Sequence, residues 1–203
     1  RLVGHKGFDL VKAVFEDMLK ADVQFAILGS GEWEFETFFY DMKEKYPDKV
    51  GLRLGFVPQL AHRIYAGADI FLMPSKSEPC GLAQMVALRY GTIPIVRETG
   101  GLKDTIQDSG DGEGNGFTFA TYNAHDMLDA IRRALTVYYN YDWAALTQRA
   151  LECDYSERRT EKDDLPDETV VYWYDFIYEK MSNLEDFRLY PEENGGEEFY
   201  LSF

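Results

Sequence analysis

The chain alternates short apolar runs with segments of helical periodicity, and this alternation constrains the fold more than any other feature. The apolar runs, near-continuous as strands covered on both faces must be, lie at residues 23–28, 50–57, 69–73 and 93–97. Apolar residues at helical spacing mark helices at 8–20, 33–46, 58–68, 81–90, 102–107, 124–139, 143–151 and 169–181. Strands that alternate with helices build a parallel sheet with helices on both faces. The sequence therefore predicts a doubly wound α/β domain, whose ligands bind at the carboxyl ends of the strands.

Acidic residues are concentrated near the end of the chain. The 203 residues carry a formal charge of −15, and the part after Leu151, with 16 acidic and 5 basic residues, contributes −11 of it. We predict a domain at 1–182, with a core at 1–151 and C-terminal helices at 152–182, followed by an acidic tail at 183–203. The acidity argues against nucleic acid or an anionic membrane as a partner. No apolar run approaches the ~20 residues that span a bilayer.

Two further features concern the setting of the protein. The two cysteines provide no disulfide framework, which favours a reducing compartment. The sequence begins at Arg1 rather than at a methionine and enters a helical pattern almost at once. We therefore expect it to be a fragment or an excised domain.

The segment at residues 74–82 is the strongest candidate for chemistry, because it links a predicted strand to a predicted helix. A helix N-terminus suits a phosphate or sugar oxygen, and Gly81 would let the backbone approach a ligand closely. Glu78 could accept sugar hydroxyls or face a developing positive charge. An equally good reading of the local pattern makes Glu78 an N-terminal helix charge. Cys80 is expected to be packed rather than nucleophilic, because free cysteine usually behaves as a small buried hydrophobe.

Three other segments carry weaker signals. Gly100-Gly101 after a strand can form an anion-receptive turn, although most such pairs are only turns. Arg1 and Lys6 could hold a diphosphate, one as a fork and one as a point charge, whereas two solvated surface charges are the simpler reading of the pair alone. Gly29-Ser30-Gly31 lacks the further glycine of the dinucleotide fingerprint, so no nicotinamide site is predicted. The three histidines show no metal spacing, and no metal or cofactor is expected.

Taken together, the segments form an ordered series over residues 1–151. The series consists of Arg1-Leu2-Val3-Gly4-His5-Lys6-Gly7-Phe8, Leu28-Gly29-Ser30-Gly31, Gly55-Phe56, Met73-Pro74-Ser75, Glu78-Pro79-Cys80-Gly81-Leu82, Arg89-Tyr90-Gly91, Thr99-Gly100-Gly101-Leu102 and Gly116-Phe117-Thr118-Phe119. This series closely resembles the C-terminal domain of bacterial and plant-type glycogen (starch) synthases. These are retaining, ADP-glucose-dependent glucosyltransferases of family 5. Their GT-B fold places the active site between two Rossmann-like domains.

The resemblance implies a role for each matching position. Arg1 and Lys6 match the pair that holds the donor diphosphate, and Glu78 matches the carboxylate that contacts the donor glucose and is needed for transfer. These three are the expected catalytic residues. The remaining positions implied to bind the nucleotide or substrate are Gly29, Gly31, Phe56 (which would stack on adenine), Cys80, Gly81, Leu82, Gly100 and Gly101.

The resemblance also implies partners and leaves alternatives. The expected partners are ADP-glucose or ADP, an α-1,4-glucan acceptor and the missing N-terminal GT-B domain, in a bacterial cytoplasm or a plant plastid. Related enzymes often carry a second Glu eight positions after the first, where this chain has Val86, which favours the ADP-glucose branch. A GT-B enzyme using UDP-sugar or another nucleotide-sugar is the alternative. With half of the cleft missing, we predict that the fragment binds ADP without catalysing transfer.

The chain departs from the pattern of the family at three places, one of which is the tail from Asn183 to Phe203, to which no counterpart in the family is assigned. His5 occupies a position where the family commonly has Gln. The short motif that usually precedes the last helix of the family is also altered here, at Asp154-Tyr155-Ser156-Glu157.

Overall fold

The computed structural model describes residues 1–155 and 200–202, and their strands form one parallel sheet. The strand order is β2-β1-β6-β3-β4-β5. The strands are β1 (Gln24–Gly29), β2 (Val50–Leu54), β3 (Ile70–Met73), β4 (Ile93–Arg97), β5 (Phe117–Phe119) and β6 (Tyr200–Ser202). Every pair is parallel, as in Ile70↔Ile93 between β3 and β4. The predicted α/β architecture is therefore confirmed.

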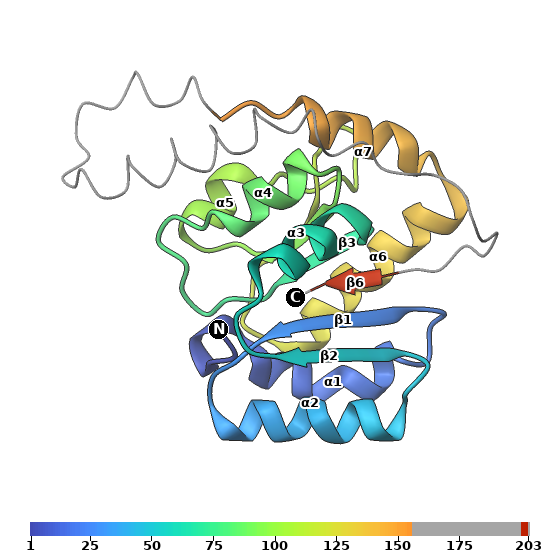
Figure 1. The fold of residues 1–203 in the computed structure, drawn as a ribbon. Helices are drawn as coiled ribbons and strands as arrows, with labels where there is room; N and C mark the ends of the chain where they lie inside the picture. Colours follow the sequence, from blue (N-terminus) through green and yellow to red (C-terminus); the bar gives the residue numbers. More distant parts are fainter. Residues whose placement is uncertain (156–199, 203) are drawn as a thin grey trace. The chain divides into compact units, whose positions relative to one another are not determined.

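Helices precede or connect the strands. The chain begins with a 3-10 turn, η1 (Gly4–Lys6), and continues through α1 (Phe8–Met18), α2 (Trp33–Lys45), α3 (Pro58–Gly67), α4 (Ala83–Arg89), α5 (Gly100–Thr105), α6 (Ala124–Asn140) and α7 (Trp143–Glu152). Figure 1 shows α1 and α2 on one side of β1 and β2, with α3, α4 and α5 gathered around β3 away from them. The α6 helix contacts α1, β4 and β5, whereas α7 contacts α4. The N-cap side chain Asn123 starts α6 by accepting hydrogen bonds from two backbone amides.

The core beneath β1 is aromatic. Phe8 and Phe15 on α1 pack edge-on against Phe39 on α2, with ring centroids 5.7 Å apart in both pairs. Phe15 also contacts Phe25 on β1, with centroids 4.7 Å apart. Every residue of β3 is buried, as the apolar run at 69–73 predicts for a strand covered on both faces.

The structure adds two strands that the sequence pattern did not predict. One is β5, which is only three residues long. The other is β6, which lies within the predicted acidic tail and pairs with both β1 and β3, through Phe25↔Leu201 and Ile70↔Leu201. Tyr200–Ser202 is thus part of the sheet, and the prediction of a separate tail is wrong for these residues. The predicted helix at 169–181 lies outside the described residues.

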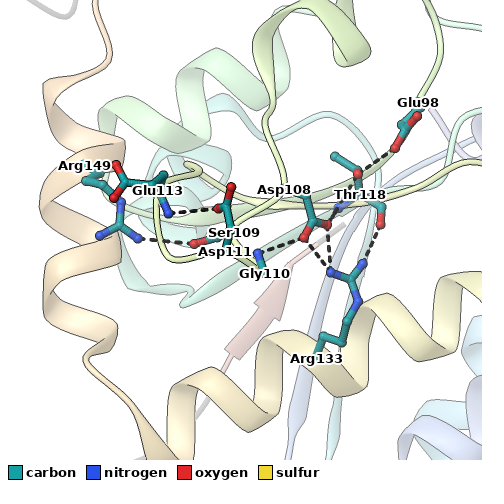
Figure 2. Close-up of polar contacts among 9 residues, drawn as sticks. All are labelled: Glu98, Asp108, Ser109, Gly110, Asp111, Glu113, Thr118, Arg133 and Arg149. Atoms are coloured by element: carbon teal, nitrogen blue, oxygen red, sulfur yellow. Dashed lines mark hydrogen bonds and ion pairs between the residues drawn. The ribbon is translucent and has the colours of Figure 1, made fainter.

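The loop between α5 and β5 is pinned by two arginines from different helices (Figure 2). Asp108 accepts hydrogen bonds of 2.7 and 2.8 Å from Arg133 on α6, and it also accepts from the backbone amides of Thr118 and Gly110. Arg149 on α7 donates to the Ser109 hydroxyl at 3.2 Å. The loop therefore connects β5 to both C-terminal helices of the described region.

Within the described residues, contacts group Arg1–Cys153 and Tyr200–Ser202 into one compact unit. Within the part of the chain that the structure describes, no helix is both long and apolar enough to cross a bilayer.

Candidate functional site

A cavity of about 470 Å³ opens where the strands end. Its wall includes Ser30 after β1, Phe56 after β2, and Pro74 and Ser75 after β3. Arg1 and Lys6 also face it. The cavity thus lies at the carboxyl ends of the strands, where a parallel sheet places its ligands.

Lys6, which lines this cavity, forms an ion pair with Glu78, although the two residues lie 72 positions apart in the sequence. The side chain of Glu78 is only 13% exposed, and that of Lys6 is 30% exposed. Ser75, itself buried, donates its hydroxyl to the same Glu78 oxygen at 3.3 Å. Glu78 therefore faces the cation of η1. Because α4 begins only at Ala83 and has no side-chain cap, the alternative reading of Glu78 as a helix-terminal charge does not hold.

The turn after Glu78 is shaped by Gly81, which adopts φ +66°. Its carbonyl accepts a hydrogen bond of 2.8 Å from the Gln84 amide nitrogen, and Gln84 is fully buried. Gln84 also donates to Thr105 on α5 at 3.1 Å. Cys80 is exposed, so the prediction that it is packed is wrong: this turn directs its side chain outward. Leu82 is the residue that precedes α4.

Gly100 and Gly101 lie in close contact with the backbone of residues 78–80. A β-carbon at Gly100 would lie 2.1 Å from the Glu78 carbonyl oxygen, and one at Gly101 would lie 1.7 Å from the Cys80 carbonyl oxygen. The Gly101 amide donates to the Glu78 and Pro79 carbonyls at 3.2 and 3.1 Å. This amide is therefore engaged with the Glu78 loop, and the glycine pair serves here to let two backbones meet.

The other predicted binding positions divide into two groups. Phe56 lies at the cavity and is 90% exposed, so its ring face is available for stacking. Gly29 also lines the cavity. Gly31 lies against Leu2, because a β-carbon there would meet the Leu2 carbonyl oxygen at 2.1 Å, and its amide donates to Glu36 at 2.7 Å. Gly31 thus holds the N-terminal segment beside the end of β1.

Sequence reasoning missed the residues that support the Glu78 loop without belonging to the predicted site. Nothing in the sequence set Gln84 apart from the other residues of its predicted helix. The hydrogen bond from Tyr122 to Asp9 joins residues 113 positions apart, so no local pattern reveals it. Arg97, at the end of β4, donates to the Ser75 and Lys76 carbonyls. Among residues 1–155 and 200–202, no three His, Cys, Asp or Glu side chains gather closely enough to hold a metal.

The chain is similar to known glycosyltransferases. The family described as glycosyl transferases group 1 matches residues 1–142. Glycogen synthase of Geobacillus thermodenitrificans is 58% identical over 163 residues, which are 79% of this chain and 34% of that protein. Glycogen synthase of Bacillus cereus (strain Q1) is 55% identical over 159 residues, 77% of this chain and 33% of that protein. The chain thus spans about a third of the length of these curated relatives.

Solved structures give the same result for the fold. The catalytic domain of starch synthase IV from Arabidopsis thaliana, bound to ADP and acarbose, superposes with a TM-score of 0.72 at 33% identity, covering 89% of this chain and 37% of that one. Sucrose-phosphate synthase from Thermosynechococcus elongatus, at a TM-score of 0.59 and 20% identity over 90% of this chain and 44% of that one, shares the fold alone. The sheet, the cavity at its carboxyl edge and the family match together show that this chain belongs to the glycosyl transferase group 1 family.

Proposed function

We propose that the chain is the C-terminal, nucleotide-binding domain of a glycogen or starch synthase. Such an enzyme transfers glucose from ADP-glucose to the non-reducing end of an α-1,4-glucan, with retention of configuration. The observation that carries the proposal is the Lys6–Glu78 pair beside a cavity that also presents Arg1 and the exposed ring of Phe56. The identity to glycogen synthases over most of the chain supports it.

In this proposal the cations act on the leaving group. Arg1 and Lys6 hold the diphosphate, and they stabilise the negative charge that grows on ADP as the glycosidic bond breaks. Arg1 contributes a planar fork and Lys6 a compact point charge.

Glu78 acts on the sugar. Its carboxylate accepts glucose hydroxyls and faces the positive charge that develops at the anomeric carbon. The backbone of Cys80, Gly81 and Leu82 approaches the sugar and phosphate, and Gly29 borders the nucleotide. Retention would follow from attack on the same face that the diphosphate leaves, with a phosphate oxygen taking the proton of the acceptor hydroxyl.

ADP is the proposed nucleotide, with UDP as the alternative. The 33% identical starch synthase IV was solved with ADP bound, and an exposed ring such as Phe56 offers a stacking surface for adenine. Titration calorimetry with ADP, ADP-glucose, UDP and UDP-glucose tests the choice. We expect ADP and ADP-glucose to bind at least about tenfold tighter, and Phe56→Ala to lose about 1–3 kcal/mol of ADP binding, as is typical of base stacking on an aromatic side chain. Tighter binding of UDP-glucose would overturn the proposal.

The proposal extends to the parts outside this chain. Because the chain spans about a third of its relatives, we propose that a second GT-B domain supplies the rest of the cleft and the glucan site, in a cytoplasmic enzyme. The chain alone should then bind ADP and leave a glucan primer unextended. Measurable extension of the primer by this chain would contradict that part of the proposal.

A further inference from the structure

Arg97 connects the end of β4 to the loop that carries Glu78. Its guanidinium donates one hydrogen bond of 2.8 Å from Nε to the Ser75 carbonyl and another of 2.5 Å from Nη2 to the Lys76 carbonyl. Two successive carbonyls of one loop are thus held by one rigid fork. Lysine, a single point charge on a flexible stem, cannot reproduce this arrangement.

Tyr122 supports Arg97 on another side. The guanidinium carbon lies 5.6 Å from the centroid of the Tyr122 ring, and the Lys76 ammonium lies 5.6 Å from the same centroid. The Tyr122 hydroxyl donates to the Asp9 carboxylate in the first turn of α1. Burial and this hydrogen bond raise the pKa of Tyr122 above its ordinary value. The support therefore reaches from the loop after β5 to α1.

The stretch that Arg97 holds is tied to both members of the ion pair. The Lys76 amide donates to the carbonyl of His5, the residue before Lys6, at 2.8 Å. The Ser75 hydroxyl donates to Glu78 itself. Residues 75 and 76 thus have two carbonyls fixed by Arg97 and one amide fixed by η1. A shift of this stretch would move Glu78 and Lys6 relative to each other.

We propose that Arg97 is a positioning residue, which, backed by Tyr122 and Asp9, fixes the loop at 74–80 and with it the Lys6–Glu78 pair. The inference rests on the proposed function, because it assigns Arg97 a part in building that nucleotide site. It differs from a direct role in which the Arg97 cation binds the diphosphate. The two roles make different predictions for amide exchange and for salt dependence.

The test compares Arg97→Met, Arg97→Lys, Tyr122→Leu and Lys6→Ala in the chain as it stands, with ADP as the probe. Arg89→Met is the matched control, because Arg89 is exposed on α4 outside the site. For Arg97→Met we expect faster hydrogen exchange at residues 75–78 and an ADP affinity lowered by about five- to tenfold, the size of one or two lost hydrogen bonds. Arg97→Lys should recover part of the affinity, Tyr122→Leu should show the same changes in weaker form, and Arg89→Met should show none.

Salt dependence separates positioning from direct binding. Lys6→Ala removes a cation that meets the diphosphate, so its ADP affinity should depend less on salt than that of the parent chain. Arg97→Met should keep the salt dependence of the parent. The positioning role would be overturned if the ADP affinity of Arg97→Met depended on salt as weakly as that of Lys6→Ala. It would also be overturned if hydrogen exchange at residues 75–78 were unchanged in Arg97→Met. Failure of the parent chain to prefer ADP over UDP would instead contradict the proposed function.

Discussion

At the scale of single residues, the candidate site pairs one cation, Lys6, with one carboxylate, Glu78. The proposed function assigns the same Lys6 ammonium to the diphosphate. The carboxylate and the incoming phosphate therefore compete for one positive charge. Because Glu78 is mostly buried, water screens this competition less than it would screen a surface pair.

Replacing Glu78 by Gln should therefore tighten ADP binding while it removes the carboxylate needed for transfer. The Lys6 ammonium then binds the diphosphate without first breaking its ion pair with Glu78. The substitution also removes one negative charge that would repel the phosphates. We expect the dissociation constant for ADP to fall by about three- to tenfold, a gain of about 1 kcal/mol. Calorimetry at low and at physiological salt measures it.

Glu34→Gln is the matched control for this change. Glu34 pairs with Lys12 at 2.7 Å, but its side chain is 63% exposed and lies on α2 outside the cavity. Its substitution should leave ADP affinity unchanged. Weaker ADP binding by Glu78→Gln would show that the carboxylate assists nucleotide binding, which would contradict the competition.

At the scale of elements, α5 positions the turn between Glu78 and α4. The contact depends on the absence of a side chain, since a β-carbon at Gly101 would lie 1.7 Å from the Cys80 carbonyl oxygen. Gly101→Ala must push the two backbones apart and break the hydrogen bonds that the Gly101 amide donates.

We expect Gly101→Ala to cost about 1–3 kcal/mol of unfolding free energy, the usual cost of overpacking, and to weaken ADP binding. Gly67→Ala is the control, because Gly67 ends α3 with nothing within 4 Å of the added carbon. It should leave the melting temperature equal or slightly higher. Thermal unfolding with and without ADP measures both variants. A Gly101→Ala protein with the stability and affinity of the parent would rule out the close contact.

The loop between α5 and β5 predicts a pH dependence of stability. Burial alone would raise the pKa of Asp108, but the hydrogen bonds from Arg133 and from the Thr118 and Gly110 amides outweigh it and hold the pKa below the ordinary 3.8. A carboxyl group whose pKa is lowered by folding stabilises the folded state above its unfolded pKa. That stabilisation is lost as the pH falls through the folded value.

Asp108→Asn should therefore lower the unfolding free energy by about 1–3 kcal/mol at neutral pH, as expected when a charged hydrogen-bond partner is lost. The difference from the parent should stay constant down to about pH 5 and shrink below the ordinary Asp pKa. Urea unfolding between pH 7 and pH 3 measures it. Asp129→Asn, which removes an exposed pair with Arg132, should have little effect. If the difference in unfolding free energy between the parent and Asp108→Asn grew as the pH fell, the lowered pKa of Asp108 would be contradicted.

The elements also show where sequence reasoning succeeds and where it stops. Hydrophobic periodicity is a local signal, and it placed every helix of the described residues to within a few positions. It missed β5, because Phe117–Phe119 is too short for a period to be recognised. The expectation that Cys80 is packed was wrong, because a thiol reveals its chemical preference but not the direction of its side chain. The family resemblance assigned Lys6 and Glu78 to one site, whereas the ion pair between them is revealed only by the structure.

At the scale of the whole molecule, an acidic chain contains the proposed site for an anionic nucleotide. Residues 1–151 carry 20 acidic and 16 basic residues, so the described part is close to balanced. Arg1 and Lys6 give the cavity a local positive character. The total charge therefore says little about the ligand, because charges beyond the Debye length of ~8 Å at physiological salt are largely screened.

The sheet is completed by residues from the far end of the chain, a pairing that no local pattern reveals. Because β6 lies between β1 and β3, it joins the β2-β1 pair to the β3-β4-β5 group. Without it, the facing backbone groups of β1 and β3 lose their partners, and each buried unpaired group costs about 1–3 kcal/mol. Removing Tyr200–Phe203 should therefore destabilise the whole domain.

We expect the chain that ends at Phe199 to lose about 3 kcal/mol or more of unfolding free energy, and to melt about 6–12 °C lower. Leu201→Pro should have a similar effect in a chain of full length, since proline cannot donate to the ladder. Thermal and urea unfolding of both variants measure the loss, and hydrogen exchange at 24–26 and 70–71, the residues that pair with β6, locates it. Unchanged melting and unchanged exchange at these residues would show that β6 does not hold the two halves of the sheet together. Faster hydrogen exchange confined to β1 and β3 would show that β6 stabilises the sheet locally, at the residues with which it pairs.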